Sequence, residues 1–534
     1  MEYAIAVIDI GMTNKKAAVY DDSLRQLDAR YRNFEPVMIK TEAPPPWEVS
    51  GPAASAELPC HDLAGMEAWF IEQLRDFASH YPVKALAVST HGATFVCTGK
   101  DGKPSLPCVY YTYEPGEALH RRFYDEFGKP EDLQARTGTP ALKAMINPAK
   151  GLFFARTVFP EAWKRAAAVL PYPQYWGLRF TGKAGIEATY MGNHTYLWDQ
   201  VEDRLSSVAE GLGIAGFIPG GGAAGPVLGK SWDVLGTIGP DVAEQTGLAK
   251  DAIVTLGIHD SNSALLPHFA KKGVAGFVLN STGTWCVIMN PMDRYGFKPE
   301  ELGKVVFFNI SAFGKPVKTA IFLGGLEFET WSTCFQARHE KKDSPPWDEG
   351  LYRSILKEQN CFLLPELTPG SGQFPSSTAR IVEGGRVWTF TDIKAAVQGR
   401  AGFSVLPPSF ANYEKLFALL RISLVMQTLT ALERTGIGKD HEIYTEGGFR
   451  KDSSYNLLLS SALKDNRVFL TDIAEATALG AAMTAKMALT GKDLAELAGD
   501  ADIEYQELRK EAFPELKGYR AAWTALAEGR PRQA

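Results

Sequence analysis

The chain has 534 residues, of which 45% are apolar and 22% are charged, and its formal net charge is −6. This length is too great for one hydrophobic core, so we expect two domains, and the mild acidity without a long basic run argues against nucleic acid as the main partner. The six cysteines are scattered without a C-x-x-C pair, which favours reduced thiols in a cytoplasmic protein over a structural zinc site.

The sequence contains no segment that predicts insertion into a membrane. Met1 and Glu2 lead directly into the first apolar stretch, which leaves no room for a signal peptide. No apolar run approaches the length that spans a bilayer. We therefore expect a cytoplasmic protein without a membrane partner.

The first stretch with chemical character is residues 4–20, AIAVIDIGMTNKKAAVY. It predicts a buried strand that carries Asp9 near its end, then a polar turn with Gly11 and Thr13, and then a second strand. Backbone N–H groups of such a turn can bind phosphate, and a carboxylate there can hold Mg²⁺. An ordinary hairpin with a solvated turn stays open as the alternative.

Polar groups also follow the next predicted strand, residues 84–90. His91 and Gly92 stand at its end, where side chains of an α/β sheet commonly face a ligand crevice. Residues 95–98 and 107–113 predict two strands about a turn. A structural histidine and a buried aromatic strand are the alternatives for these two places.

A strand-to-helix junction follows at residues 252–266, AIVTLGIHDSNSALL, and contains Asp260. A carboxylate at such a junction can simply cap the helix. The glycine-rich residues 217–229 predict a loop, because a lone glycine run is poor support for phosphate binding. The proline-rich residues 44–59 predict a surface connection.

The second half repeats the plan of the first hairpin. Residues 274–280 predict a strand, 281–284 a tight turn and 285–289 another strand. Further on, the sequence predicts a long helix, a strand that ends in two glycines, a helix and a short strand, an alanine-rich helix and a tail; these span residues 413–433, 441–448, 453–463, 467–470, 475–486 and 493–534. We expect the tail to be helical and peripheral.

Taken in order from residue 3 to about 487, these segments resemble the FGGY carbohydrate kinases of the actin, hexokinase and heat-shock ATPase superfamily. The first turn matches the family's Asp-x-Gly-Thr-Thr/Ser-x-x-Lys/Arg motif through Asp9, Gly11, Thr13 and Lys16, with Met12 in place of the first threonine. Residues 280–285, NSTGTW, resemble the second phosphate motif, and residues 447–448 resemble the adenosine motif.

The resemblance implies an α/β fold of two actin-like ATPase (ribonuclease H-like) domains with a cleft between them, residues 1–268 and 269–490, followed by the tail 491–534. It implies ATP-dependent phosphorylation of a sugar, with Asp260 as the catalytic base and Asp9 as the Mg²⁺ ligand. ATP would be bound by Gly11, Thr13, Lys16, Gly283, Thr284, Gly447 and Gly448, and the sugar by His91, Gly92, Thr112, Glu114, His194 and Asp260.

Residues 192–195, GNHT, resemble the rhamnulokinase and fuculokinase branches, which implies a ketose such as L-rhamnulose or L-fuculose, phosphorylated on its primary hydroxyl. A pentulose or polyol substrate is the alternative, because residues 110–115 lack the family's usual arginine and place Glu114 near the aspartate position. A non-catalytic sugar sensor or a chaperone-like ATPase on the same scaffold also stays open. A small sugar is the expected partner, and a homodimer is one assembly left open.

Overall fold

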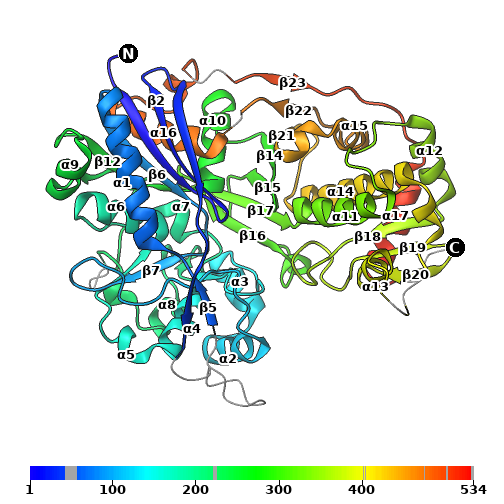
Figure 1. Cartoon of the computed structure of the whole chain (residues 1–534), viewed down its shortest axis with the longest axis horizontal. Helices are drawn as coiled ribbons and strands as arrows, with labels where there is room; N and C mark the ends of the chain where they lie inside the picture. The colour runs from blue at the N-terminus through cyan, green and yellow to red at the C-terminus, as the bar shows by residue number, and fades with distance from the viewer. Residues whose placement is uncertain are drawn as a thin grey trace.

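The computed structural model describes residues 1–41, 57–220, 225–400, 402, 405–473, 475–500 and 503–530. Two mixed sheets of seven strands form its framework, one built from the first half of the chain and one from the second (Figure 1). The α/β fold expected from the sequence is therefore confirmed. The predicted surface connection, residues 44–59, lies mostly outside the described residues, but residues 57–60 form a strand.

The first sheet has the strand order β11-β12-β6-β1-β2-β3, with β13 paired to β6. Strand β1 runs antiparallel to β2 and parallel to β6, so the predicted hairpin is present. The strands are β1 (Ala4–Ile10), β2 (Asn14–Asp21), β3 (Gln26–Asn33), β6 (Val83–Thr90), β11 (Val234–Thr237), β12 (Ile253–Thr255) and β13 (Ile258–His259).

The second sheet, in the order β16-β17-β15-β14-β21-β22-β23, repeats this plan. Its hairpin β14–β15 is antiparallel, and β14 runs parallel to β21, as β1 does to β6. The strands are β14 (Phe277–Thr282), β15 (Cys286–Pro291), β16 (Val306–Ile310), β17 (Pro316–Phe322), β21 (Glu442–Gly447), β22 (Val468–Thr471) and β23 (Tyr505–Glu507).

The two sheets meet through helices α10 (Asp260–Lys272) and α16 (Ala476–Thr490). Ile5 and Val7 face this shared core, whereas Ala6 and Ile8 face the opposite layer of helices, α1 (Leu63–His80), α6 (Tyr172–Thr181) and α9 (Pro240–Thr246). Burial on both faces explains why the strand sequences are almost continuously apolar.

The alanine-rich helix α16 crosses α10 closely, because a Cβ added to Gly480 would lie 1.9 Å from the carbonyl oxygen of Ser263. The crossing therefore requires glycine at this position, although glycine is an unfavourable residue in the middle of a helix.

A third group of elements lies below the first sheet in the view of Figure 1 and has its own apolar core. It contains α2 (Glu117–Phe127), α3 (Pro130–Thr137), α4 (Pro148–Val158), α5 (Pro160–Trp163), α7 (Ala188–Met191), α8 (Ser207–Gly211) and the short strands β4 (Val37–Lys40), β5 (Glu57–Cys60), β7 (Phe95–Thr98), β8 (Ala168–Pro171), β9 (Trp198–Asp199) and β10 (Arg204–Leu205). The prediction that residues 95–98 and 107–113 pair was wrong: β7 pairs with β8, because residues 107–113 form turns and a single bridge to Cys60.

The second sheet is covered by α11 (Gly324–His339), α12 (Glu349–Glu358), α13 (Phe390–Val397), α14 (Tyr413–Arg434), α15 (Ser453–Ala462) and α17 (Leu516–Ala527), beside a small sheet of β18 (Cys361–Leu364), β19 (Arg380–Glu383) and β20 (Arg386–Thr389). By length and composition alone α14 could cross a membrane, but 89% of its apolar window is buried inside the protein. This helix is therefore part of the core.

The tail contains a helix, α17, as we expected, but it is not peripheral. Residues 505–507 form the edge strand of the second sheet, and Trp523 in α17 is fully buried, with its indole N–H donating to the Leu363 carbonyl at 2.8 Å. The tail is therefore part of the second half's packing.

Candidate active site

A cavity of about 380 Å³ lies where the two sheets meet. Its lining comes from the ends of β6 and β13, from the two hairpin turns and from the strands β15, β16 and β17. Several of the residues that sequence reasoning singled out are brought together here: Thr13, His91, Gly92, His194, Asp260, Gly283 and Thr284. We call this space the inner cavity.

Asp260 is the first residue of α10 and the only charged side chain among the described residues that line the inner cavity. Its Oδ1 accepts hydrogen bonds from the backbone N–H of Ser261 at 2.6 Å and from the Ser261 hydroxyl at 3.2 Å. Burial raises the pKa of Asp260 to about 6. Among the described residues none donates to Oδ2, so this oxygen can accept a proton from a bound ligand.

Asp9 lies at the end of β1, next to the cavity wall. The hydroxyl of Thr477, which does line the cavity, donates to Asp9 Oδ2 at 2.6 Å. Burial raises the pKa of Asp9 to about 6, the Thr477 hydroxyl opposes this shift, and the nearby Asp260 carboxylate adds to it. Two buried carboxylates that repel each other favour a bound cation.

The described residues contain no group of three or more His, Cys, Asp or Glu side chains that could hold a metal ion unaided. A magnesium ion usually takes one or two carboxylates and completes its shell with water and substrate phosphates. Asp9 fits that requirement, because its carboxylate is buried beside the cavity and Lys16, which stands opposite it on β2, bonds to Gln26 and Glu475.

The first turn presents Met12 and Thr13 to the inner cavity. The ammonium group of Lys15 lies beneath this turn and donates to the carbonyl oxygens of Met12 at 2.7 Å and Thr13 at 3.4 Å. Lys16 instead lies on the other face of β2, where it donates to Gln26 at 2.9 Å and pairs with Glu475 at 3.3 Å. Lys16 is therefore not placed among the cavity-lining residues. Gly11 closes the turn through its N–H to the Asn14 carbonyl at 3.0 Å.

Three histidine rings surround Gly92. A Cβ at Gly92 would lie 2.5 Å from Asn193 Nδ2, 3.0 Å from His194 Nε2 and 3.1 Å from His259 Nε2, so only glycine fits without displacing them. Burial lowers the pKa of His91, His194 and His259 to about 3 each, so all three are neutral near pH 7.

Several polar atoms of this cluster have no hydrogen-bond partner among the residues that the structure describes. They are His91 Nε2, His194 Nδ1 and Asn193 Oδ1. A buried polar atom without a partner costs about 1–3 kcal/mol. The cluster therefore offers neutral donors and acceptors to the hydroxyl groups of a ligand.

Two sequence-predicted sugar residues lie elsewhere. Glu114 accepts hydrogen bonds from His120 at 2.8 Å and from the backbone N–H groups of Gly116 and Ala144 at 3.0 and 2.8 Å, and neither it nor the exposed Thr112 lines the inner cavity. The chain turns after Tyr110, so only Tyr111 of this segment faces the cavity.

A second cavity of about 520 Å³ adjoins the inner one, and the two share Thr282 and Gly283 of the second turn. We call it the outer cavity. Gly448 lines it, and Gly447 has a φ of +79° at the point where a Cβ would lie 2.0 Å from the Thr282 carbonyl oxygen. The Phe449 N–H donates to the Thr282 hydroxyl at 2.9 Å, which ties this glycine turn to the second turn.

The outer cavity has features that sequence reasoning missed. The rings of Phe328 and Phe449 form an aromatic wall, with centroids 5.8 Å apart, and the loop with Pro345 and Pro346 lies opposite. Arg421 also lines it and donates through Nε to Asp452 Oδ2 at 2.8 Å. The size and the aromatic wall suit a nucleoside.

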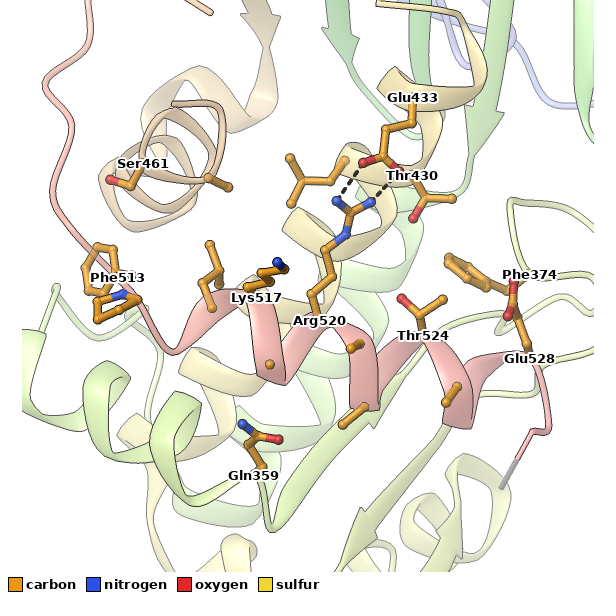
Figure 2. Close-up of a pocket in the computed structure, with 18 of the residues that line it drawn as sticks. Gln359, Phe374, Thr430, Glu433, Ser461, Phe513, Lys517, Arg520, Thr524 and Glu528 are labelled. Carbon is orange, nitrogen blue, oxygen red and sulfur yellow. Dashed lines mark hydrogen bonds and ion pairs between the residues drawn. The ribbon is translucent and has the colours of Figure 1, made fainter. Parts of the chain in front are cut away.

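A larger cavity of about 1380 Å³ lies around α17, α14 and α15. Figure 2 shows Arg520 reaching from α17 to Glu433, which it contacts at 2.7 and 2.6 Å. None of the sequence-predicted site residues lines this space. Its size alone does not make it the active site, since it lacks the convergent carboxylates and glycine turns.

Comparison with known proteins agrees with this geometry. Residues 275–493 match the family model "Carbohydrate kinase FGGY, C-terminal domain". The comparison with curated proteins gives no match.

Solved structures share the whole fold. A carbohydrate kinase from Novosphingobium aromaticivorans is 25% identical with a TM-score of 0.73, covering 99% of both chains. A ligand-bound xylulose kinase from Lactobacillus acidophilus is 14% identical with a TM-score of 0.74, covering 98% of this chain and 97% of that one. Plasmodium falciparum glycerol kinase with ADP is 13% identical with a TM-score of 0.72, covering 99% of both chains.

The rhamnulokinase and fuculokinase branches are named by neither the family model nor these three structures. The second half of the chain therefore matches the C-terminal domain model of the FGGY carbohydrate kinases, and the whole chain is similar to a solved carbohydrate kinase.

Proposed function

We propose that the protein transfers the γ-phosphoryl group of ATP to a primary hydroxyl of a neutral sugar held in the inner cavity. One observation carries the proposal: the inner cavity, with its free carboxylate oxygen on Asp260, shares the Thr282–Gly283 turn with the nucleoside-sized outer cavity. A nucleotide in the outer cavity would direct its terminal phosphate across this turn toward Asp260.

In this reaction Asp260 takes the proton of the attacking hydroxyl. The pKa of about 6 keeps the carboxylate ionised at neutral pH and still makes it a stronger base than an exposed aspartate. Backbone N–H groups and hydroxyls at Thr13, Gly283 and Thr284 would bind the phosphate oxygens that gain charge in the transition state.

The Mg²⁺ held by Asp9 would neutralise charge on the phosphates of ATP. Lys15 supports the same region from beneath the first turn. Its ammonium group donates to two carbonyl oxygens of the turn. It therefore places a positive charge beside the backbone that would face the phosphates. Lys16, which we expected to bind ATP directly, would act on Glu475 instead.

The lining of the inner cavity favours a neutral sugar with several hydroxyl groups. Asp260 would repel an anionic acceptor, and the histidine cluster offers unpaired donors and acceptors. Next to that cluster the cavity has an apolar wall of Ile146, Trp285, Val287, Phe307 and Ile321, and the Phe307 ring meets the His194 ring edge to face. This wall, together with Tyr111, would cover the apolar face or methyl group of an L-rhamnulose- or L-fuculose-like ketose.

The experiment is a screen of ADP release with ATP, Mg²⁺ and single sugars: L-rhamnulose, L-fuculose, D-xylulose, D-ribulose, gluconate, erythritol and glycerol. We expect a ketohexose of the deoxy type to give the highest kcat/KM. Glycerol should be poor, because it leaves several cavity groups unpaired at about 1–3 kcal/mol each. ADP release that no sugar stimulates would favour the sensor or chaperone-like alternative.

A further inference from the structure

Strand β16 of the second sheet contributes two side chains to the inner cavity. Alternate residues of a strand share a face, and Phe307 and Asn309 both line the cavity. The intervening Phe308 is held by the first half of the chain: its N–H donates to the Gly138 carbonyl at 3.0 Å, and its carbonyl accepts from Gln200 Nε2 at 2.7 Å.

Asn309 is an unusual residue at this place. Its side chain is 1% exposed and lies on a strand whose neighbours are mainly apolar. Within the described part of the chain, its Nδ2 has a single long contact, 3.4 Å to the Thr319 hydroxyl on β17, and its Oδ1 has no partner. A buried amide oxygen without a partner, on a side chain that lines a cavity, is costly unless water or a ligand donates to it.

β16 also touches the loop that carries the sugar-facing histidine. The Phe307 ring meets the His194 ring edge to face, with centroids 5.9 Å apart. Gly192 packs so closely on Ile310 that a Cβ would lie 2.4 Å from it. The position of Asn309 is therefore fixed relative to the histidine cluster, although the two belong to different sheets.

We propose that Asn309 is a specificity-determining residue, whose Oδ1 accepts a hydrogen bond from an acceptor hydroxyl other than the one that is phosphorylated. The proposal rests on the proposed function of the inner cavity. It assigns part of sugar selection to the second half of the chain, and Phe307 beside it covers the adjoining C–H face of the same sugar.

The test compares wild type with Asn309→Leu, which removes the acceptor and keeps a similar branched shape. Asn290→Leu is the matched control. Asn290 is also 1% exposed, lies on β15, donates through Nδ2 to the Thr435 carbonyl and has an unpaired Oδ1, but it does not line the cavity. Melting temperatures of all three proteins establish that each is folded.

Calorimetric affinity for the best sugar of the screen, measured without nucleotide, is the first readout. We expect Asn309→Leu to weaken it by about 5- to 150-fold and to leave ADP affinity within about twofold, and Asn290→Leu to leave both unchanged. The second readout uses singly deoxygenated analogues of that sugar. One analogue should bind wild type weakly and lose nothing further in Asn309→Leu, because the partner hydroxyl is already absent.

Equal sugar affinity in Asn309→Leu and Asn290→Leu would overturn the proposal, as would equal losses for every analogue. The proposed function is judged separately by wild type. If wild type shows sugar-stimulated ADP release and Asn309→Leu keeps the wild-type sugar affinity, only this inference is wrong. If wild type binds no sugar, both this inference and the proposed function are wrong.

Discussion

Replacing Asp260 by asparagine should abolish turnover and stabilise the protein. The amide keeps the shape and the acceptor for the Ser261 N–H, but it cannot take a proton. Loss of a general base typically costs about 10²- to 10⁴-fold in rate. We expect kcat to fall by that amount while ADP affinity stays within about twofold, because Asp260 does not line the outer cavity.

The stability gain follows from the same carboxylate. Its pKa is raised from 3.8 to about 6, a shift of about two units, and each unit corresponds to about 1.4 kcal/mol. Because 28% of the side chain is open to the cavity, water there reduces the penalty, and we expect about 1–3 kcal/mol.

The sign of the pH dependence is fixed by the raised pKa. Well below the ordinary aspartate pKa of 3.8 the carboxyl is protonated in both folded and unfolded chains, so wild type and Asp260→Asn should melt alike there. As pH rises through 6 the folded wild type carries a buried charge, and the variant should become more stable by about 2–6 °C. Wild-type kcat/KM should rise over the same interval, because the base must be ionised.

The assay is ADP release at pH 4 to 8 and melting temperature from about pH 2.5 to 8, for wild type and Asp260→Asn. Turnover within tenfold of wild type would refute the role of Asp260 as the base and leave it as a helix-terminal residue. A variant that is less stable at pH 8 would refute the argument from buried charge.

Other substitutions separate the parts of the site. Asp9→Ala should lower kcat and weaken its dependence on Mg²⁺ concentration with sugar affinity unchanged; a selective loss of sugar affinity would move Asp9 out of the nucleotide site. Thr284→Val removes a hydroxyl at nearly constant volume and should reduce kcat about tenfold, whereas unaltered kinetics would make the second turn structural only. Gly92→Ala should raise the sugar KM at least about tenfold, because its Cβ would meet Asn193 at 2.5 Å; an unchanged KM would mean that the histidine cluster does not bind the acceptor.

The framework of the fold could be predicted from the sequence because its signals are local. The β1–β2 and β14–β15 hairpins combine apolar strands with polar glycine turns, and the β13–α10 junction places Asp260 by the same kind of pattern. These elements also bring the turn of the β14–β15 hairpin and Asp260 to the same cavity.

The rest depends on partners that are distant in sequence. Lys15 and Lys16 alternate across β2, and nothing local tells that Glu475 pairs with Lys16. The sequence could not tell that Tyr111 faces the cavity and Glu114 does not, because the difference depends on the turn after Tyr110 and on the bond from the Ala144 N–H to Glu114. Asn309 and Phe307 could not be assigned to the cavity from the sequence. The sequence of a strand indicates which residues share a face, but not which cavity that face lines.

The most direct test of the account is a ³¹P NMR spectrum of ATP, Mg²⁺ and the best ketose of the screen with wild type and with Asp260→Asn. For wild type we expect one new phosphomonoester signal, split by two methylene protons, which grows in the same molar amount as ADP. For the variant this signal should be nearly absent. Inorganic phosphate as the only product, formed at the same rate with or without sugar and in both proteins, would contradict the account.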